Sequence, residues 1–273
     1  MKASLPIRMS CFALLFGSVA PGSSASLIGL DSFSYADGAV AGQTGGTGWT
    51  YELTDEAGAP AQSPSNWDLV FGNSPAVTAG ALVTERGGVK REFGGTTTGS
   101  TFPSNEREGA LRGSGVWYAG VDFRVGNLIA AGVNQWAGLS SYDFDAERIF
   151  FGMPGQTTAT RYFGIQGALS TIPVQANTDY RLVFGLDFDN DLLSLWVNPD
   201  GADNASSYDF SQAYTGGNWS TAVRLASGGD GSDSIPVTYD NLVVATDFAT
   251  AVPEPSAAVL ALLGGLLLAR RRR

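Results

Sequence analysis

The chain has 273 residues, 44% of them hydrophobic and 15% charged, with 36 glycines and a formal net charge of −10. This apolar fraction suffices for a buried core, and many glycines beside few charges favour strands and turns over helices. An acidic chain repels phosphate backbones, and histidine is absent, so nucleic acid, His-based catalytic groups and His-ligated metals are excluded.

The start of the chain, residues 1–25, is predicted to be a signal peptide. Lys2 and Arg8 give it a basic beginning, a short apolar run follows, and small residues precede the expected cleavage between Ala25 and Ser26. The apolar run is too short for an ordinary membrane-spanning helix. The single cysteine lies in this segment, so we expect an exported body without a disulfide or a cysteine-ligated zinc.

The body, residues 26–248, has the period of β-strands. Apolar side chains occupy every second position in residues 117–125 and 180–188, and Leu242, Val244 and Phe248 follow the same period in 242–248. Further strand candidates are residues 27–34, 67–71, 79–85, 148–152, 161–166 and 192–197. Turn-forming residues separate them, as in Asn198-Pro199-Asp200-Gly201. No helical period appears before the C-terminal tail. The sequence predicts one all-β domain, an antiparallel β-sandwich.

The segment Asp143-Phe144-Asp145-Ala146-Glu147 is the strongest candidate for carboxylate chemistry. On a strand its three acids would share one face, and retaining glycoside hydrolysis needs two carboxyl groups about 5 Å apart. The segment lies between two apparent strands, however, where a hairpin loop belongs. We expect a solvated loop, with catalysis as the alternative.

A second acidic cluster comprises Asp187, Asp189 and Asp191. Spaced carboxylates suit calcium, but the EF-hand pattern fails because Leu192 and Asn198 stand at its Gly and Glu positions. A tight turn between two strands needs the same residue types. We expect a turn here, with calcium as the alternative, and neither a metal nor a cofactor in the protein.

Tryptophans are the candidates for stacking on sugar rings. The six are Trp49, Trp67, Trp117, Trp136, Trp196 and Trp219. Trp117 shares the apolar face of its strand, so we expect it in the core. Trp219 follows Gly216-Gly217-Asn218 and is expected to be the most exposed. Sugar contact is therefore predicted at Trp219 if anywhere.

The C-terminal region, residues 249–273, has three parts in order. After a short tether it contains the Pro253-Glu254-Pro255 motif, an apolar segment at 257–269 and four arginines at 270–273. Thirteen residues of helix reach about 20 Å, short of the roughly 30 Å hydrocarbon core. The arginines are expected to stay cytoplasmic, which places the body outside. These three parts are compatible with a plain membrane anchor and with a tail that is removed by processing.

This tail resembles the PEP-CTERM sorting signal, which joins a Pro-Glu-Pro motif, a short apolar helix and a basic cluster. The resemblance covers about the last 22 residues, from 252 on. It implies that an exosortase-type enzyme processes the chain near Pro253, Glu254 and Pro255. It also implies a place at the cell surface or in an extracellular matrix with exopolysaccharide, reached through a membrane-bound stage.

Four segments of the body resemble a recurrent exported domain similar to the laminin-G/concanavalin A-like jelly roll. They are 31–35 (DSFSY), 45–49 (GGTGW), 194–199 (SLWVNP) and 239–244 (YDNLVV). The resemblance implies a fold and little about activity. We therefore expect a non-enzymatic surface or matrix protein. A carbohydrate-binding module and a glycoside hydrolase of the concanavalin A-like fold are the alternatives.

Overall fold

The structure is a computed structural model that describes residues 27–54, 60–93, 115–143, 146–214, 220, 222–230 and 236–252. The expected cleavage site at Ala25 and Ser26 lies outside these residues, and so do Pro253, Glu254, Pro255 and the rest of the tail. In the part of the chain that is described, no helix is long and apolar enough to cross a membrane.

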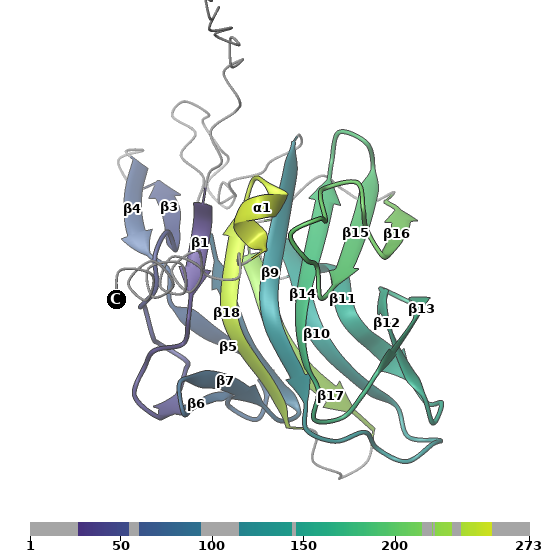
Figure 1. Ribbon diagram of the computed structural model, residues 1–273. Helices are drawn as coiled ribbons and strands as arrows, with labels where there is room; N and C mark the ends of the chain where they lie inside the picture. The colour runs from purple at the N-terminus through teal and green to yellow at the C-terminus, as the bar shows by residue number, and fades with distance from the viewer. Residues whose placement is uncertain are drawn as a thin grey trace, which may run out of the picture.

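A nine-stranded sheet, here the front sheet, faces the viewer in Figure 1. Its order is β16-β15-β14-β9-β18-β7-β6-β2, and β1 pairs with β18. The strands are β1 (Leu27–Asp31), β2 (Gly38–Ala39), β6 (Ala76–Thr78), β7 (Ala81–Thr84), β9 (Val116–Val125), β14 (Asp179–Asp187), β15 (Leu192–Val197), β16 (Phe210–Ala213) and β18 (Val237–Ala245).

A seven-stranded back sheet lies behind it, in the order β13-β12-β11-β10-β17-β8-β5. Its strands are β5 (Trp67–Gly72), β8 (Gly87–Glu92), β10 (Gln135–Asp143), β11 (Ala146–Gln156), β12 (Arg161–Ile165), β13 (Ala168–Val174) and β17 (Ala222–Gly229). A separate ribbon pairs β3 (Thr50–Thr54) with β4 (Pro60–Pro64). The pairings are antiparallel, as in β9 with β14 and β10 with β11. The predicted antiparallel β-sandwich is confirmed.

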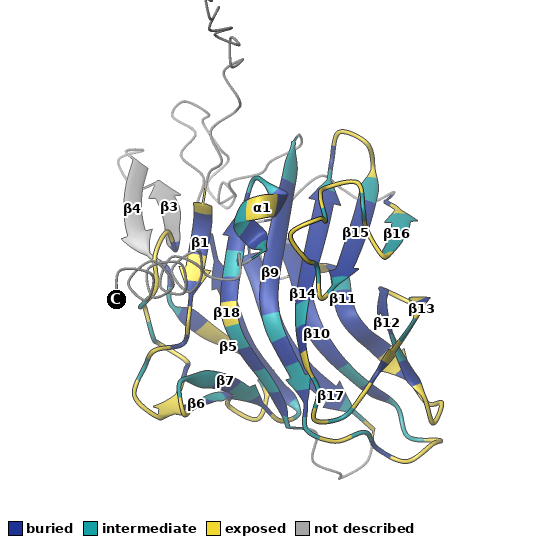
Figure 2. Ribbon diagram, viewed as in Figure 1, coloured by how far each residue is buried: buried dark blue, intermediate teal, exposed yellow. Residues whose placement is uncertain are grey.

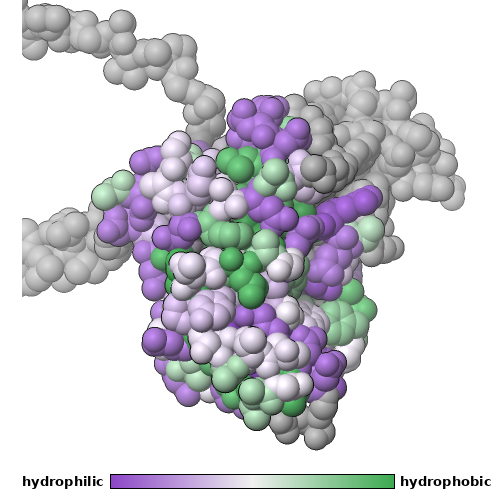
Figure 3. All heavy atoms as spheres, turned by 90° about the vertical axis from the view of Figure 1, so that its right-hand side faces the viewer, coloured by the Kyte–Doolittle hydropathy of each residue, from purple (hydrophilic) through white to green (hydrophobic). Residues whose placement is uncertain are grey.

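The core lies between the two sheets, where Figure 2 shows buried residues along the central strands of both. Period-two alternation produces it, because successive side chains of a strand point to opposite faces. Trp117 of β9 is fully buried, as predicted, and Phe184 of β14 meets Phe151 of β11 with ring centroids 4.9 Å apart. Apolar and hydrophilic residues are interspersed on the edge where β13 and β16 lie (Figure 3).

Two predicted strands have other bounds in the structure. The strand expected over 242–248 stops at Ala245, and Asp247 caps a short helix, α1 (Phe248–Ala251), by accepting a hydrogen bond from the Thr250 N–H at 2.9 Å. Three of its four residues belong to the region from 249 on, where a tether was expected. The strand expected over 79–85 begins at Ala81, because the residues before it form the turn from β6.

The helix α1 packs on the outer face of the front sheet, outside the main core. Phe248 lies 4.7 Å from Trp196 and 5.8 Å from Tyr118 between ring centroids. The Arg181 guanidinium donates to the Ala251 carbonyl at 2.7 Å. A tether was expected from residue 249 on. The described part of it, up to residue 252, is folded against the sandwich.

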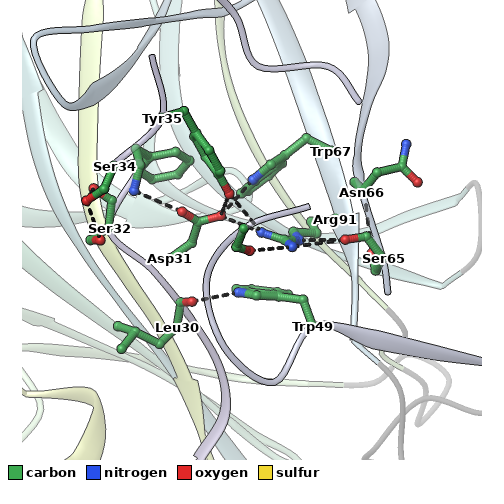
Figure 4. A network of polar contacts seen from close by, with 12 residues as sticks. Leu30, Asp31, Ser32, Ser34, Tyr35, Trp49, Ser65, Asn66, Trp67 and Arg91 are labelled. Atoms are coloured by element: carbon green, nitrogen blue, oxygen red, sulfur yellow. Dashed lines mark hydrogen bonds and ion pairs between the residues drawn. The ribbon is translucent and has the colours of Figure 1, made fainter. Parts of the chain in front are cut away.

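A buried ion pair joins the start of the chain to the back sheet (Figure 4). Asp31 of β1 is 1% exposed and accepts from Arg91 of β8, from the Tyr35 hydroxyl at 2.6 Å and from the Trp67 indole at 2.9 Å. Burial, followed by the hydrogen bond to Asp31, raises the pKa of Tyr35 to about 12. Both sequence segments that resemble the opening of the exported domain meet here, since Arg91 also donates to the Gly45 carbonyl at 2.7 Å. The cluster therefore serves the fold.

Candidate functional site

A groove of about 590 Å³ crosses the outer face of the back sheet. Leu139 of β10 and Leu225 of β17 belong to the core, and side chains alternate along each strand. Trp136 and Arg224 therefore lie on the opposite, outer face, where both line the groove. Strands β5 and β11 supply further walls. The site is thus built on paired strands, which hold side chains more rigidly than loops do.

The floor of the groove consists of aromatic rings that lie against glycines. A Cβ atom on Gly228 would come within 2.4 Å of the Trp136 ring, and one on Gly88 within 2.9 Å of the Phe71 ring. Trp136 is the centre of the row, with ring centroids 5.8 Å from both Phe71 and Phe150. All three rings are half-buried. Their free surface gives the groove an apolar floor of the kind that stacks on pyranose rings.

A charged pair lies beside the rings. The Arg224 Nη2 atom donates to the Glu147 Oε1 atom at 2.5 Å, and the Ser140 hydroxyl donates to the same oxygen at 2.6 Å. Arg224 also donates to the Tyr142 hydroxyl at 2.8 Å, and its guanidinium lies 5.8 Å from the Trp136 ring centroid. The Arg224 side chain is 7% exposed and that of Glu147 is 38% exposed. The carboxylate is therefore the part of the pair that faces the groove.

Strand register brings these residues together. Ser140 is opposite Arg224 in the pairing of β10 with β17. Tyr142 is opposite Glu147 in the pairing of β10 with β11, where the register shifts by a bulge. A bulge re-aims the side chains next to it. The hairpin of β10 and β11 and the distant strand β17 thus contribute one polar cluster.

The predicted carboxylate segment lies at the β10–β11 hairpin, as expected. The expectation that all of it is a solvated loop is wrong for Glu147, because this residue is on β11 and is held by Arg224. Asp143 ends β10, while Asp145 and the Asp143 side chain lie outside the described part. Of the three acids, the structure therefore assigns only Glu147 to the groove.

The second acidic cluster forms the predicted turn, between β14 and β15. Asp187 accepts from the backbone N–H groups of Asp189 at 3.1 Å and Asn190 at 2.9 Å. Asp189 accepts from the Gly115 N–H at 2.9 Å. Two of the three carboxylates thus bond the chain itself. Among the described residues, no group of three Asp or Glu side chains could hold a metal ion.

The tryptophans divide into core and groove residues. Four are buried, namely Trp49, Trp67, Trp117 and Trp196. Trp219, where sugar contact was predicted, lies outside the described residues. Trp136 was one of the six predicted stacking candidates, but sugar contact was predicted at Trp219 instead, although Ala137 and Leu139 beside Trp136 alternate as a core face. That alternation was the signal that places Trp136 on the outer face.

A second hollow, of about 430 Å³, lies on the outer face of the front sheet. Its charges are paired with one another: Arg181 binds Asp122 at 3.1 Å, and Arg124 binds Asp179 at 3.1 Å. Burial raises the pKa of Asp240, which also lines it. No aromatic floor on glycines accompanies these residues in the described lining, so this hollow is the weaker candidate.

No protein-family model matches the sequence, and no curated protein matches it. Solved structures similar to the chain include a sialidase (10% identity, 67% of this chain and 17% of that chain, TM-score 0.42). They also include an alginate lyase from Corynebacterium sp. (11% identity, 72% of this chain and 92% of that chain, TM-score 0.42). A third is the CBM2 module of the evolved Dit of Lactobacillus casei BL23 phage J-1 (10% identity, 64% of this chain and 80% of that chain, TM-score 0.42). Likenesses of this strength assign neither a family nor a function.

Proposed function

We propose that this chain is an exported, non-enzymatic protein of the cell surface or extracellular matrix that binds polysaccharide in the groove of the back sheet. The observation that carries the proposal is the aromatic floor of Phe71, Trp136 and Phe150 beside the partly exposed Glu147 carboxylate. Sugar sites combine these features, because aromatic faces stack on the apolar side of a pyranose while polar groups bind its hydroxyls.

The acids of the described lining support binding without hydrolysis. Hydrolysis of a glycosidic bond requires two carboxyl groups on either side of the bond. Glu147 is the sole acid in the described lining, and one of its oxygens is committed to Arg224 and Ser140. The glycoside hydrolase alternative therefore needs a second acid that the described lining does not supply.

The two ends of the chain support the proposed location at the cell surface or in the extracellular matrix. A basic start with an apolar run before Ser26, and the Pro253-Glu254-Pro255 motif before an apolar segment, fit export followed by exosortase processing. The jelly-roll body is the part that would remain at the surface with the exopolysaccharide.

Intact-mass analysis of surface-extracted protein tests the processing. We expect a chain that starts at Ser26 and lacks the apolar segment at 257–269. A mature chain that retains Arg270–Arg273 would instead identify a plain membrane anchor.

Affinity electrophoresis of the full-length chain in gels that contain soluble polysaccharides tests the binding. We expect Trp136→Ala to weaken retardation by about fivefold or more, because one stacked ring is worth about 1 kcal/mol beyond its buried area. Tyr208→Ala is the control, since Tyr208 is 38% exposed and packs on Trp196 rather than in the groove. Equal retardation of both variants would contradict the site. Release of reducing ends that Glu147→Gln abolishes would favour the hydrolase instead.

A further inference from the structure

We infer that the groove selects uncharged polysaccharides and excludes those that carry carboxylate or sulfate groups, with Glu147 as the selecting residue. This inference rests on the proposed function, because it names the class of ligand for the same groove. It follows from which hydrogen-bonding groups of the groove are free and which are already engaged.

Glu147 offers the groove a free hydrogen-bond acceptor. Glu147 Oε1 takes hydrogen bonds from Arg224 and Ser140, whereas Oε2 has no partner among the described residues. An ionised carboxylate can only accept hydrogen bonds. A sugar hydroxyl can donate one, and such a bond to a charged acceptor is stronger than one between neutral groups. A uronate or sulfate group has no proton to donate and carries the same sign of charge.

The cations near the groove do not offset the repulsion between Glu147 and an anionic ligand. Arg224 points its Nη atoms at Glu147, Ser140 and Tyr142, and its Nε atom, which has no partner among the described residues, is buried. Its side chain is only 7% exposed. Arg148, the other cation in the described lining, has an interaction partner of its own. An anionic ligand would therefore meet an open carboxylate and no free cation among these residues.

The charge of the whole body acts in the same direction. Residues 26–252 contain 25 acidic and 10 basic side chains. A net negative field lowers the local concentration of a polyanion around the protein. Stacking on Trp136 needs no charge on the ligand. The apolar floor and the carboxylate thus agree on a neutral glycan.

The test uses the full-length chain and the Glu147→Gln variant, with neutral β-1,3- and β-1,4-glucans and mannan against polygalacturonate, alginate and a sulfated galactan. The unmodified chain should bind at least one neutral polymer and none of the charged ones. Glu147→Gln should weaken neutral binding by about tenfold, the value of one charge-assisted hydrogen bond. The same change leaves Arg224 uncompensated, so binding of the polyuronates, absent in the unmodified chain, should become measurable.

A second measurement needs no variant. Between low and high salt, affinity for the neutral polymer should stay constant, whereas polyanion binding governed by attraction would fall. Tighter binding of a polyuronate than of every neutral polymer would overturn the selectivity and leave polysaccharide binding standing. Absence of binding to all polymers would overturn the proposed function itself.

Discussion

Arg91 brings a full charge into the interior and engages every donor that its guanidinium has. Its N–H groups reach Asp31, Tyr35, Gly45 and Ser65, and the guanidinium lies 4.9 Å from the ring centroid of Trp49. Such a pair specifies one arrangement of the chain because each unpaired half is costly. The loops that follow β1 are held by this one cluster.

Asp31→Asn tests this cluster. Removing the negative partner leaves a buried cation, which is expected to lower the free energy of unfolding by about 3–5 kcal/mol in urea denaturation. The matched control is Asp179→Asn, because the Asp179 side chain is 82% exposed in its pair with Arg124. Surface pairs contribute about 0–1 kcal/mol. Equal losses in the two variants would show that the buried pair does not hold the fold.

Tyr239 links the two sheets through its hydroxyl, which donates to the Ala226 carbonyl at 2.6 Å and lies 3.2 Å from the Gly138 carbonyl oxygen. Complete burial raises its pKa above the ordinary value, and the pKa of Tyr35 is raised to about 12. A group that keeps its proton more tightly when folded stabilises the protein below its unfolded pKa, and that stability is lost as pH rises.

We therefore expect the urea midpoint to be steady from neutral pH to about pH 10 and to fall as the pH rises from there towards about 12. Tyr239→Phe should lower the midpoint at neutral pH and make the alkaline fall shallower, because the ionisable hydroxyl is gone. The measurement is a series of urea titrations across this range. A midpoint that stays constant up to pH 12 would contradict the role of the buried hydroxyls.

Among the strands, those with strong alternation were predictable and those with polar or glycine-rich faces were not. β9 and β14 were predicted because one face of each is continuously apolar. β8 (Gly87–Glu92) and β17 (Ala222–Gly229) were missed, because their outer faces carry Lys90, Arg224 and glycines that read locally as loop residues. Their positions in the sheet are set by pairing with β5 and β10. This pairing depends on residues of other strands, which a local pattern does not contain.

The candidate site was predictable only in part for the same reason. Glu147 was singled out because it belongs to a local acidic pattern. Arg224, Trp136 and Phe71 come from other strands, and only cross-strand pairing shows that they meet. Asp187 and its neighbours were predicted correctly as a turn, since turn chemistry is local.

The packing of α1 on the front sheet depends on a glycine of β9. A Cβ atom on Gly120 would lie 2.1 Å from the Ala251 carbonyl oxygen and 2.4 Å from Arg181. Gly120→Ala should therefore displace α1, lower the free energy of unfolding by about 1–3 kcal/mol and speed chymotryptic cleavage after Phe248. Gly201→Ala is the control, because nothing lies within 4 Å of a Cβ atom there. Equal cleavage rates in the two variants would contradict the packing.

At the scale of the whole molecule, the groove and the end of the described chain lie on opposite faces. The groove is on the outer face of the back sheet. α1 and Val252 pack on the outer face of the front sheet, against Tyr118 and Trp196. The strands between are buried, so the two faces are held apart rigidly. For a body attached through the residues after Val252, as proposed above, we expect the groove to face away from the attachment.

Coupling the protein to a solid surface through single cysteines tests this orientation. In a Cys11→Ser background, Arg273→Cys attaches the chain by its tail, and Gln166→Cys attaches it at the exposed rim of the groove. The tail-coupled protein is expected to capture soluble polysaccharide as well as the free protein binds it, because its back sheet faces the solution. The rim-coupled protein is expected to lose most of its capture, since the surface occludes the groove. The coupling chemistry is the same in both, so equal capture would show that the polysaccharide binds elsewhere on the molecule.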